Sequence, residues 1–331
     1  MKAALILKKN ELVVTDVPDL PSAHSNEDMV AINVSYVGIC GSDLHYYYDG
    51  QVGAFELREP LIPGHEMSGY LDDGTPVTIH PATFGTCQPG LEDQPHIWPH
   101  GAYFGSASTW PHTQGAMVER ILVRKDQVHV LPATLDIRRA ALVEPLSVAL
   151  HAITLAGNLN GKKVLVSGAG PIGQLAAAAA LVKGAQQVWL SDIFDEPLER
   201  AHALGEITTV NVSTDQLPEE EFDIVLECAG VAAATTAALV AARRQATVVQ
   251  VGMLPGQPVG INLAPLVAKE LSLKGTFRFN DEINQSIQLL AEHELFDAVI
   301  THTFDLSEVH TAFATAKNAQ LSGKVLVKVG R

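Results

Sequence analysis

Cysteine is scarce in this sequence: only Cys40, Cys87 and Cys228 occur among 331 residues. An odd and sparse count in a long chain argues against a framework of disulfide bonds, which small secreted domains use to compensate for a limited core. We therefore expect the fold to be held by packing and any functional cysteine to act as a free thiol.

Long apolar runs and an excess of basic residues are also missing. The longest run of Ala, Leu and Val covers residues 175–182, far short of a membrane span. The N-terminal segment MKAALILKKNE has too short an apolar run for the core of a signal peptide. Lys and Arg number 22 against 37 Asp and Glu, a formal net charge of −15. Such an acidic surface repels phosphate backbones and anionic lipids, so we expect neither nucleic-acid nor membrane partners. The sparse cysteines and the N-terminal segment lead us to expect a cytoplasmic protein.

The pattern of expected secondary structure changes near residue 146. Before it, short alternating strands are followed by a Pro-, Gly- and His-rich stretch typical of a β-rich domain with long loops. After it, Ala-rich helical stretches alternate with five short apolar strands, which is typical of βαβ units in a parallel sheet. These strands are expected at 163–167, 187–191, 223–227, 246–251 and 270–275.

The last part of the chain is mixed again and ends in a strand-like segment, 324–329. The predicted fold is therefore α/β. Residues 1–146 and 280–331 would form one β-rich domain, and residues 147–279 would form an inserted, doubly wound parallel-sheet domain.

The segment VLVSGAGPIGQL contains a strand, a glycine turn and a helix start, the context that a G-x-G-x-x-G dinucleotide-binding motif requires. Gly168 permits the tight turn, Gly170 lets the backbone approach a pyrophosphate, and Gly173 lets the helix pack close to the sheet. Pro171 and Ile172 lie in the first helical turn, whose free N–H groups attract negative charge. A glycine turn used only for packing is the simpler alternative, but the complete context favours a cofactor.

Asp192 ends the second expected strand of this region. A carboxylate there accepts hydrogen bonds from the adenosine ribose and repels a 2′-phosphate, which predicts NAD rather than NADP. Val251 and Gly252, at the end of a later strand, complete the expected cofactor-binding set.

Three short segments carry metal-ligand chemistry: GICGSDLHY at 38–46, GHE at 64–66 and VEP at 143–145. Each is ordinary by itself, since a lone cysteine is usually a small buried hydrophobe. Together they offer a thiolate, an imidazole and two carboxylates, the ligand types of a catalytic zinc that keeps one position open. These groups belong to Cys40, His65, Glu66 and Glu144.

These motifs, in this order before the dinucleotide motif, resemble those of the zinc-containing medium-chain alcohol dehydrogenases. Residues 40–66 are most similar to the polyol branch, which includes the sorbitol dehydrogenases, and the stretches YFGSA and GTFRF are similar to those of the L-idonate 5-dehydrogenases. The resemblance covers nearly the whole chain. It implies a GroES-like catalytic domain with an inserted Rossmann domain, and a homodimer or homotetramer.

The resemblance also implies roles for single residues. Cys40, His65 and Glu66 match the zinc ligands of the family. Glu144 adjoins the metal or its bound water, and in some states it displaces that water as a direct ligand. Asp43 matches a residue that hydrogen-bonds His65 and fixes its tautomer. Lys324 matches a basic residue that neutralises this aspartate.

The implied reaction interconverts a secondary alcohol of a polyol or sugar acid and the ketone. Zinc would act as a Lewis acid on the substrate oxygen, and hydride would pass to or from NAD. Ser42, His45 and Tyr46, together with Glu144, are the predicted catalytic residues, which carry the proton or hold other hydroxyls.

Arg278 is the predicted contact for the substrate's polar or anionic end, because a guanidinium grips a carboxylate bidentately. This local cation would reconcile an acidic protein with an anionic substrate. Tyr46 is expected to contact the substrate as well, and Phe104 and Phe279 to form apolar walls.

Many relatives have four cysteines in a lobe that binds a second, structural zinc, whereas residues 84–100 retain only Cys87. One thiolate cannot close a tetrahedral site, so we expect one zinc per chain. A makeshift site of Cys87, His96 and His100 is the weaker alternative, because histidines in a Pro-rich loop are usually solvated or packed.

Two other functions are compatible with the same fold: a zinc-independent quinone-type reductase and a non-catalytic dinucleotide-binding protein. Neither needs the complete ligand set of Cys40, His65 and Glu66, which therefore argues against both.

Overall fold

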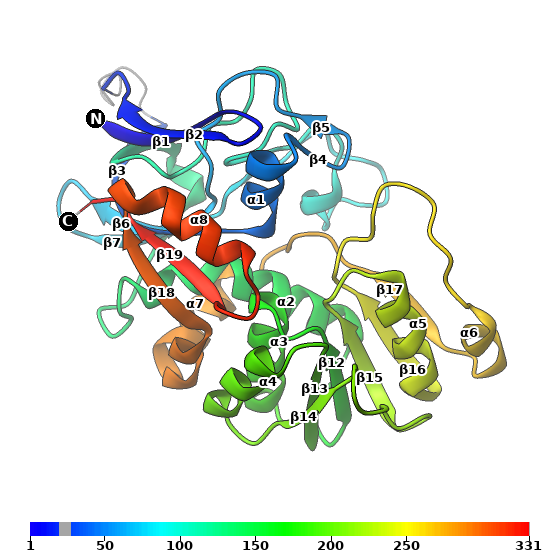
Figure 1. The fold of residues 1–331 in the computed structure, drawn as a ribbon. Coiled ribbons are helices and arrows are strands. Elements are labelled where there is room, and N and C mark those ends of the chain that lie inside the picture. The colour runs from blue at the N-terminus through cyan, green and yellow to red at the C-terminus, as the bar shows by residue number, and fades with distance from the viewer. Residues whose placement is uncertain (20–27, 331) are drawn as a thin grey trace.

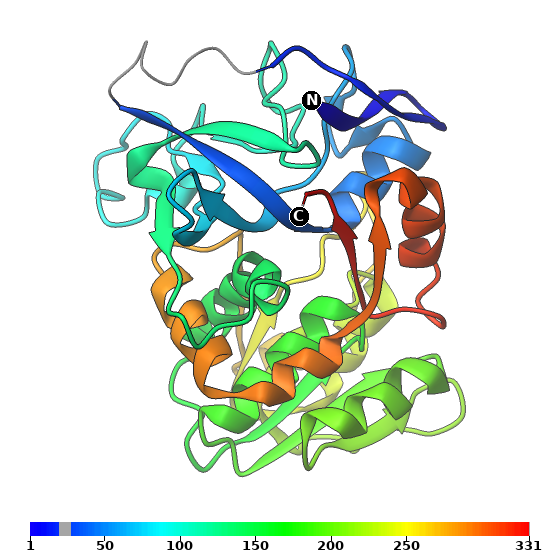
Figure 2. The same ribbon diagram turned by 90° about the vertical axis from the view of Figure 1, so that its left-hand side faces the viewer.

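The computed structural model describes residues 1–19 and 28–330, which contain two main sheets stacked along the molecule (Figures 1 and 2). The first sheet has the order β11-β7-β6-β3-β19-β18, with β10 also paired to β3. Its strands are β3 (Met29–Gly38), β6 (Glu66–Leu71), β7 (Pro76–Ile79), β10 (Arg120–Arg124), β11 (Val128–Val130), β18 (Ile300–Asp305) and β19 (Lys324–Lys328). Because β19 pairs antiparallel with β3, the last part of the chain completes the sheet that the first part begins.

Smaller elements surround this sheet. Three two-stranded ribbons are formed by β1 (Lys2–Lys8) with β2 (Glu11–Asp16), β4 (Gln51–Val52) with β5 (Phe55–Glu56), and β8 (Ala82–Thr83) with β9 (Ala102–Tyr103). Two helices, α1 (Gly41–Tyr48) and α8 (Val309–Lys317), pack near one another beside the sheet (Figure 1). Apolar residues of β3, β7 and α8 share one core, which lies between this sheet and the helix.

The second sheet is parallel throughout, with the order β14-β13-β12-β15-β16-β17. Its strands are β12 (Lys163–Ser167), β13 (Gln187–Asp192), β14 (Thr208–Asn211), β15 (Phe222–Glu227), β16 (Ala242–Gln250) and β17 (Ser272–Gly275). The accompanying helices are α3 (Pro171–Val182), α4 (Asp195–Ala201), α5 (Ala232–Ala241) and α6 (Ala264–Ala268). The predicted α/β fold is confirmed, as are the positions of the five predicted strands to within a few residues, whereas β14 was not predicted. Strand order reverses between β12 and β15, and ligands of such sheets bind outside the strand ends at this switch point.

Helix α2 (Val143–Ala156) joins the two sheets, and α7 (Ile283–Glu292) packs against it. The segment Arg139–Ala156 is long and apolar enough, by length and composition only, to cross a membrane, but 78% of it is buried inside the protein. It is therefore best explained as a core helix. Alanines of α3 pack into the same core, where their small side chains let α2 and α3 approach closely.

Candidate active site

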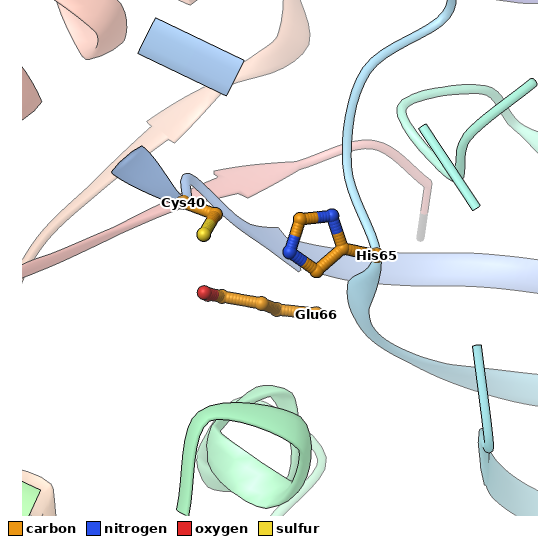
Figure 3. A group of neighbouring side chains, drawn as sticks. All are labelled: Cys40, His65 and Glu66. Atoms are coloured by element: carbon orange, nitrogen blue, oxygen red, sulfur yellow. The ribbon is translucent and has the colours of Figure 1, made fainter. Parts of the chain in front are cut away.

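Cys40, His65 and Glu66 converge beside the first sheet, with their side chains turned toward one another (Figure 3). Their ligand atoms lie within 4.8 Å of one another, and no other such group of three occurs in residues 1–19 and 28–330. Cys40 follows β3 and precedes α1, whereas Glu66 opens β6, where it pairs with Gly38 of β3. A Cβ atom on Gly38 would collide with the Glu66 carboxylate, which explains the glycine at this position.

The chemistry of this group suits a cation. Burial alone would lower the pKa of His65, but the charges of Cys40, Glu144 and Asp43 and a hydrogen bond with Cys40 raise it to about 10. His65 Nδ1 and Glu66 Oε2 are buried and have no hydrogen-bond partner in the described part of the chain. Each such unpaired atom costs about 1–3 kcal/mol unless a ligand satisfies it. A thiolate, an imidazole and a carboxylate with free ligand atoms fit zinc.

Lys324 pairs with Glu66 and not with Asp43, so its predicted partner is wrong. Its Nζ donates to Glu66 Oε1 at 2.6 Å and to the Ile39 carbonyl at 3.1 Å. Burial alone would lower the pKa of Lys324, but the charge of Glu66 raises it. The register of β19 on β3 places Lys324 just beyond the end of β3, beside the metal-ligand group.

Asp43 also differs from its predicted role. Its two oxygens accept hydrogen bonds from the backbone N–H groups of Cys40 and Gly64, both at 2.9 Å, in place of the predicted bond from the His65 ring. Burial raises the pKa of this carboxyl. Asp43 therefore ties together the backbones of the two segments that carry the metal-ligand residues, and it acts on His65 through charge.

Glu144 and Arg278 reach the metal-ligand group through a residue that the sequence did not single out, Tyr103. Its hydroxyl donates to Glu144 Oε1 at 2.6 Å, and burial raises the pKa of both groups. The centroid of the Tyr103 ring lies 5.3 Å from that of His65, and Arg278 Cζ lies over the Tyr103 ring, 4.0 Å from its centroid. Its place beside Phe104 in the YFGSA motif was the only available signal, because the direction of its hydroxyl depends on contacts distant in sequence.

The backbone of Arg278 is in the left-handed region, with φ of 51°. A non-glycine residue held there costs about 1–3 kcal/mol, and such residues are concentrated at functional sites. Burial lowers the pKa of Arg278, while the neighbouring Tyr103 and Glu144 favour its charge. The guanidinium is thus a partly buried cation beside the candidate metal site.

The residues of α1 divide between the site and the surface. Tyr46 is buried, and its hydroxyl accepts the Ala107 N–H at 2.9 Å. Ser42 is partly exposed in the first turn, two residues after Cys40. His45 instead lies on the exposed side, where its Nδ1 is 2.8 Å from Asp49 Oδ2. Tyr46 is therefore enclosed in the core of the first sheet, which contradicts its predicted substrate contact, and His45 lies outside the site.

The two predicted apolar walls lie in hydrophobic cores. Phe104 is half-buried against the core of the first sheet. Phe279 is 1% exposed, and its ring centroid lies 4.6 Å from that of His80. The prediction for Phe279 is wrong, because a side chain so completely enclosed has no surface to offer a substrate.

The glycine turn has the predicted geometry. Gly168 has φ of 103°, and a Cβ atom there would meet the backbone of Ala229. A Cβ atom on Gly173 would meet the Gly168 carbonyl, and Gly170 caps α3. Asp192 Oδ2 accepts the Ala169 N–H at 2.7 Å, so the acidic residue and the turn form one unit.

The remaining cofactor candidates surround this turn. Pro171 and Ile172 open α3. The N–H groups of Val251 and Gly252 both donate to the Glu227 carbonyl at 2.8 Å, which places them at the carboxyl ends of β15 and β16. All of these predicted residues thus lie around the switch point of the sheet.

The lobe at 84–100 does not assemble the makeshift metal site. Cys87 is exposed, whereas His96 is buried with its ring 4.7 Å from that of His151. Within the lobe, Trp98 Nε1 donates to the Leu91 carbonyl at 2.7 Å. Packing and hydrogen bonds therefore hold the lobe where relatives are expected to use zinc.

Two family models match the chain. The alcohol dehydrogenase GroES-like domain matches residues 26–133, and the zinc-binding dehydrogenase domain matches residues 171–292. Among curated proteins, L-idonate 5-dehydrogenase (NAD(P)(+)) of Escherichia coli K12 is 34% identical over 80% of this chain and 81% of its own length. Sorbitol dehydrogenase of Bacillus subtilis 168 is 30% identical over 96% of this chain and 93% of its own.

Solved structures show the same similarity. The crystal structure of L-idonate 5-dehydrogenase from Escherichia coli K-12 superposes with a TM-score of 0.91 at 30% identity, covering 99% of this chain and 97% of that chain. The likeness includes both sheets, because it extends over nearly all of each chain.

Proposed function

The chain belongs to the zinc-binding alcohol dehydrogenases with a GroES-like domain, and from this we propose that it interconverts a secondary alcohol of a polyol or sugar acid and the corresponding ketone, with NAD as hydride carrier. The convergence of Cys40, His65 and Glu66, with unpaired ligand atoms, carries this proposal. A zinc-independent reductase or a non-catalytic binding protein has no use for such a buried, highly charged group.

We assign Cys40, His65 and Glu66 to hold one zinc, with Glu144 beside it. When bound, zinc supplies Lewis-acid polarisation of a substrate oxygen. Glu144, whose pKa is raised by burial, and Ser42 can hold or move the hydroxyl proton. Arg278 would bind the substrate's polar or anionic end, beside Tyr103 and Glu144.

The nucleotide would bind over the glycine turn, with its adenosine ribose at Asp192. The carboxylate supports a preference for NAD over NADP, although the idonate relative carries both cofactors in its name. We also propose the domain division at residues 146 and 279, a cytoplasmic location, and assembly into a homodimer or homotetramer. The apolar side chains of Val267 and Leu273, exposed on α6 and on the edge strand β17, support self-association.

The test is reduction of NAD by zinc-loaded protein over a panel of L-idonate, sorbitol, xylitol and threonine. We expect turnover of at least one sugar acid or polyol, and loss of turnover after zinc is removed and the protein dialysed. Turnover that persists in metal-free protein would support the quinone-type alternative, and NADH binding without any turnover would support a non-catalytic role.

A further inference from the structure

Glu282 is a buried carboxylate that bridges two parts of the site's framework. Its Oε1 lies 2.8 Å from His151 Nδ1, and its Oε2 accepts the Asn280 N–H at 2.8 Å. The side chains of His151 and Glu282 are only 8% and 6% exposed. Burial alone would raise the pKa of Glu282, but the hydrogen bond and charge of His151 lower it. The carboxylate is therefore ionised, and both of its oxygens have a fixed partner.

The two partners belong to different segments, each of which carries a candidate active-site residue. His151 is on α2, seven residues and about two turns beyond Glu144, so both lie on the same face of one helix. Ser147 lies between them and contacts Ser286 of α7 at 2.9 Å through their hydroxyls. On the other side, Asn280 is two residues from Arg278. Glu282 thus connects the helix that carries Glu144 to the segment that carries Arg278.

The lobe at 84–100 covers this connection. Asn280 Nδ2 donates to the Asp93 carbonyl at 2.8 Å, and the His96 ring packs edge-on against the His151 ring. Burial lowers the pKa of His96, which favours a neutral ring. The lobe at 84–100 therefore packs against both partners of Glu282, His151 and Asn280.

We propose that Glu282 is a positioning residue for the substrate. By fixing the Asn280 backbone to the rigid α2 helix, it holds Arg278 in its left-handed conformation over Tyr103, and so sets the affinity for a substrate's anionic end. This inference rests on the proposed function of Arg278.

The test compares Glu282→Gln with Glu292→Gln, the same change at an exposed position of α7. An amide has one accepting oxygen and one NH2 group, so it cannot accept hydrogen bonds at both positions, and either the Asn280 N–H or the His151 ring would lose its acceptor. In Glu282→Gln we expect KM for L-idonate to rise about tenfold, the effect of losing one hydrogen bond to a charged group. We expect kcat, zinc content and KM for neutral sorbitol to stay within about twofold. An equal rise for both substrates, or no rise, would overturn the inference.

A second readout needs no turnover. In zinc-loaded Glu282→Gln, modification of Arg278 by phenylglyoxal, followed by mass spectrometry, should be several-fold faster than in the unsubstituted protein. An unchanged rate would contradict the positioning role even if the protein oxidises none of these substrates, which separates this failure from failure of the proposed function. If Glu282→Gln does not fold, His151→Phe, which keeps a ring against His96 and removes the hydrogen-bonding nitrogen, should show the same faster modification, and an unchanged rate there would equally contradict it.

Discussion

Lys324 Nζ donates to Glu66 Oε1 at 2.6 Å, and the two side chains are only 3% and 1% exposed. The residues are 258 positions apart in the chain, and the pairing of β19 with β3 brings them together. One oxygen of Glu66 is thereby neutralised, while the other is unpaired within the described residues and available to a metal.

Replacement of Lys324 by Met should destabilise the metal-free protein by ~3–5 kcal/mol, because it leaves a carboxylate buried without its cation. Zinc should recover part of this loss, since a bound cation stabilises the folded state. Urea unfolding with and without zinc measures both effects. Lys328→Met, at an exposed position of the same strand, should change the free energy of unfolding by less than about 0.5 kcal/mol. An equal loss in the free energy of unfolding in the two variants would show that the ion pair of Lys324 with Glu66 does not stabilise the protein.

Zinc binding should depend steeply on pH. The pKa of His65 in the metal-free protein is raised to about 10, so its imidazole is protonated at neutral pH. A zinc ligand must be neutral, so binding releases this proton, and affinity should rise at least about tenfold per pH unit from pH 6 to 8. Competition with a chromophoric chelator measures the slope. A flat profile would mean that His65 is not a ligand or is already neutral.

Tyr103→Phe should lower kcat/KM for the polyol or sugar-acid substrate by about 10- to 100-fold, the range for losing a hydrogen bond to a charged group. The affinity for NADH should not change, because Tyr103 contacts Glu144 and Arg278 and not the glycine turn. Tyr70→Phe, at the far end of β6, is the matched control. Full activity of Tyr103→Phe would contradict a role for the Tyr103 hydroxyl in the reaction.

Asp192→Ser should narrow the preference for NAD over NADP by about tenfold or more, because it removes one charge that would face a 2′-phosphate. The ratio of kcat/KM for the two cofactors measures it. Glu199→Ser, an exposed change on α4, should leave the ratio within about twofold on the same reasoning. A higher kcat/KM with NADP in the unsubstituted protein would contradict the role of Asp192.

Local patterns were sufficient to predict five of the six parallel strands, the glycine turn and the metal-ligand group, but not the short edge strand β14. Each depends on residues close in sequence or on a motif whose backbone geometry is narrow, as at Gly168. The surface position of His45 could also have been predicted from the sequence, since Asp49 follows it by four residues, about one helical turn.

Contacts between distant segments were not predictable in the same way. The partner of Lys324 follows from the register of two strands, and the hydroxyl direction of Tyr103 follows from where α2 begins. Phe279 follows Arg278 in the GTFRF segment, for which substrate contacts were predicted, yet its ring lies in the core beside His80. The direction in which a side chain points depends on its packing against distant segments, which the local spacing of residues does not reveal.

The most direct measurement determines zinc content and alcohol-dependent NADH formation together in Cys40→Ala and Cys87→Ser. The unsubstituted protein and Cys87→Ser should each hold about one zinc per chain after dialysis and be equally active, because one complete ligand set is present and Cys87 lies outside it. Cys40→Ala should lose both zinc and activity while it still binds NADH. Full turnover by metal-free Cys40→Ala would contradict a zinc-dependent reaction at this site.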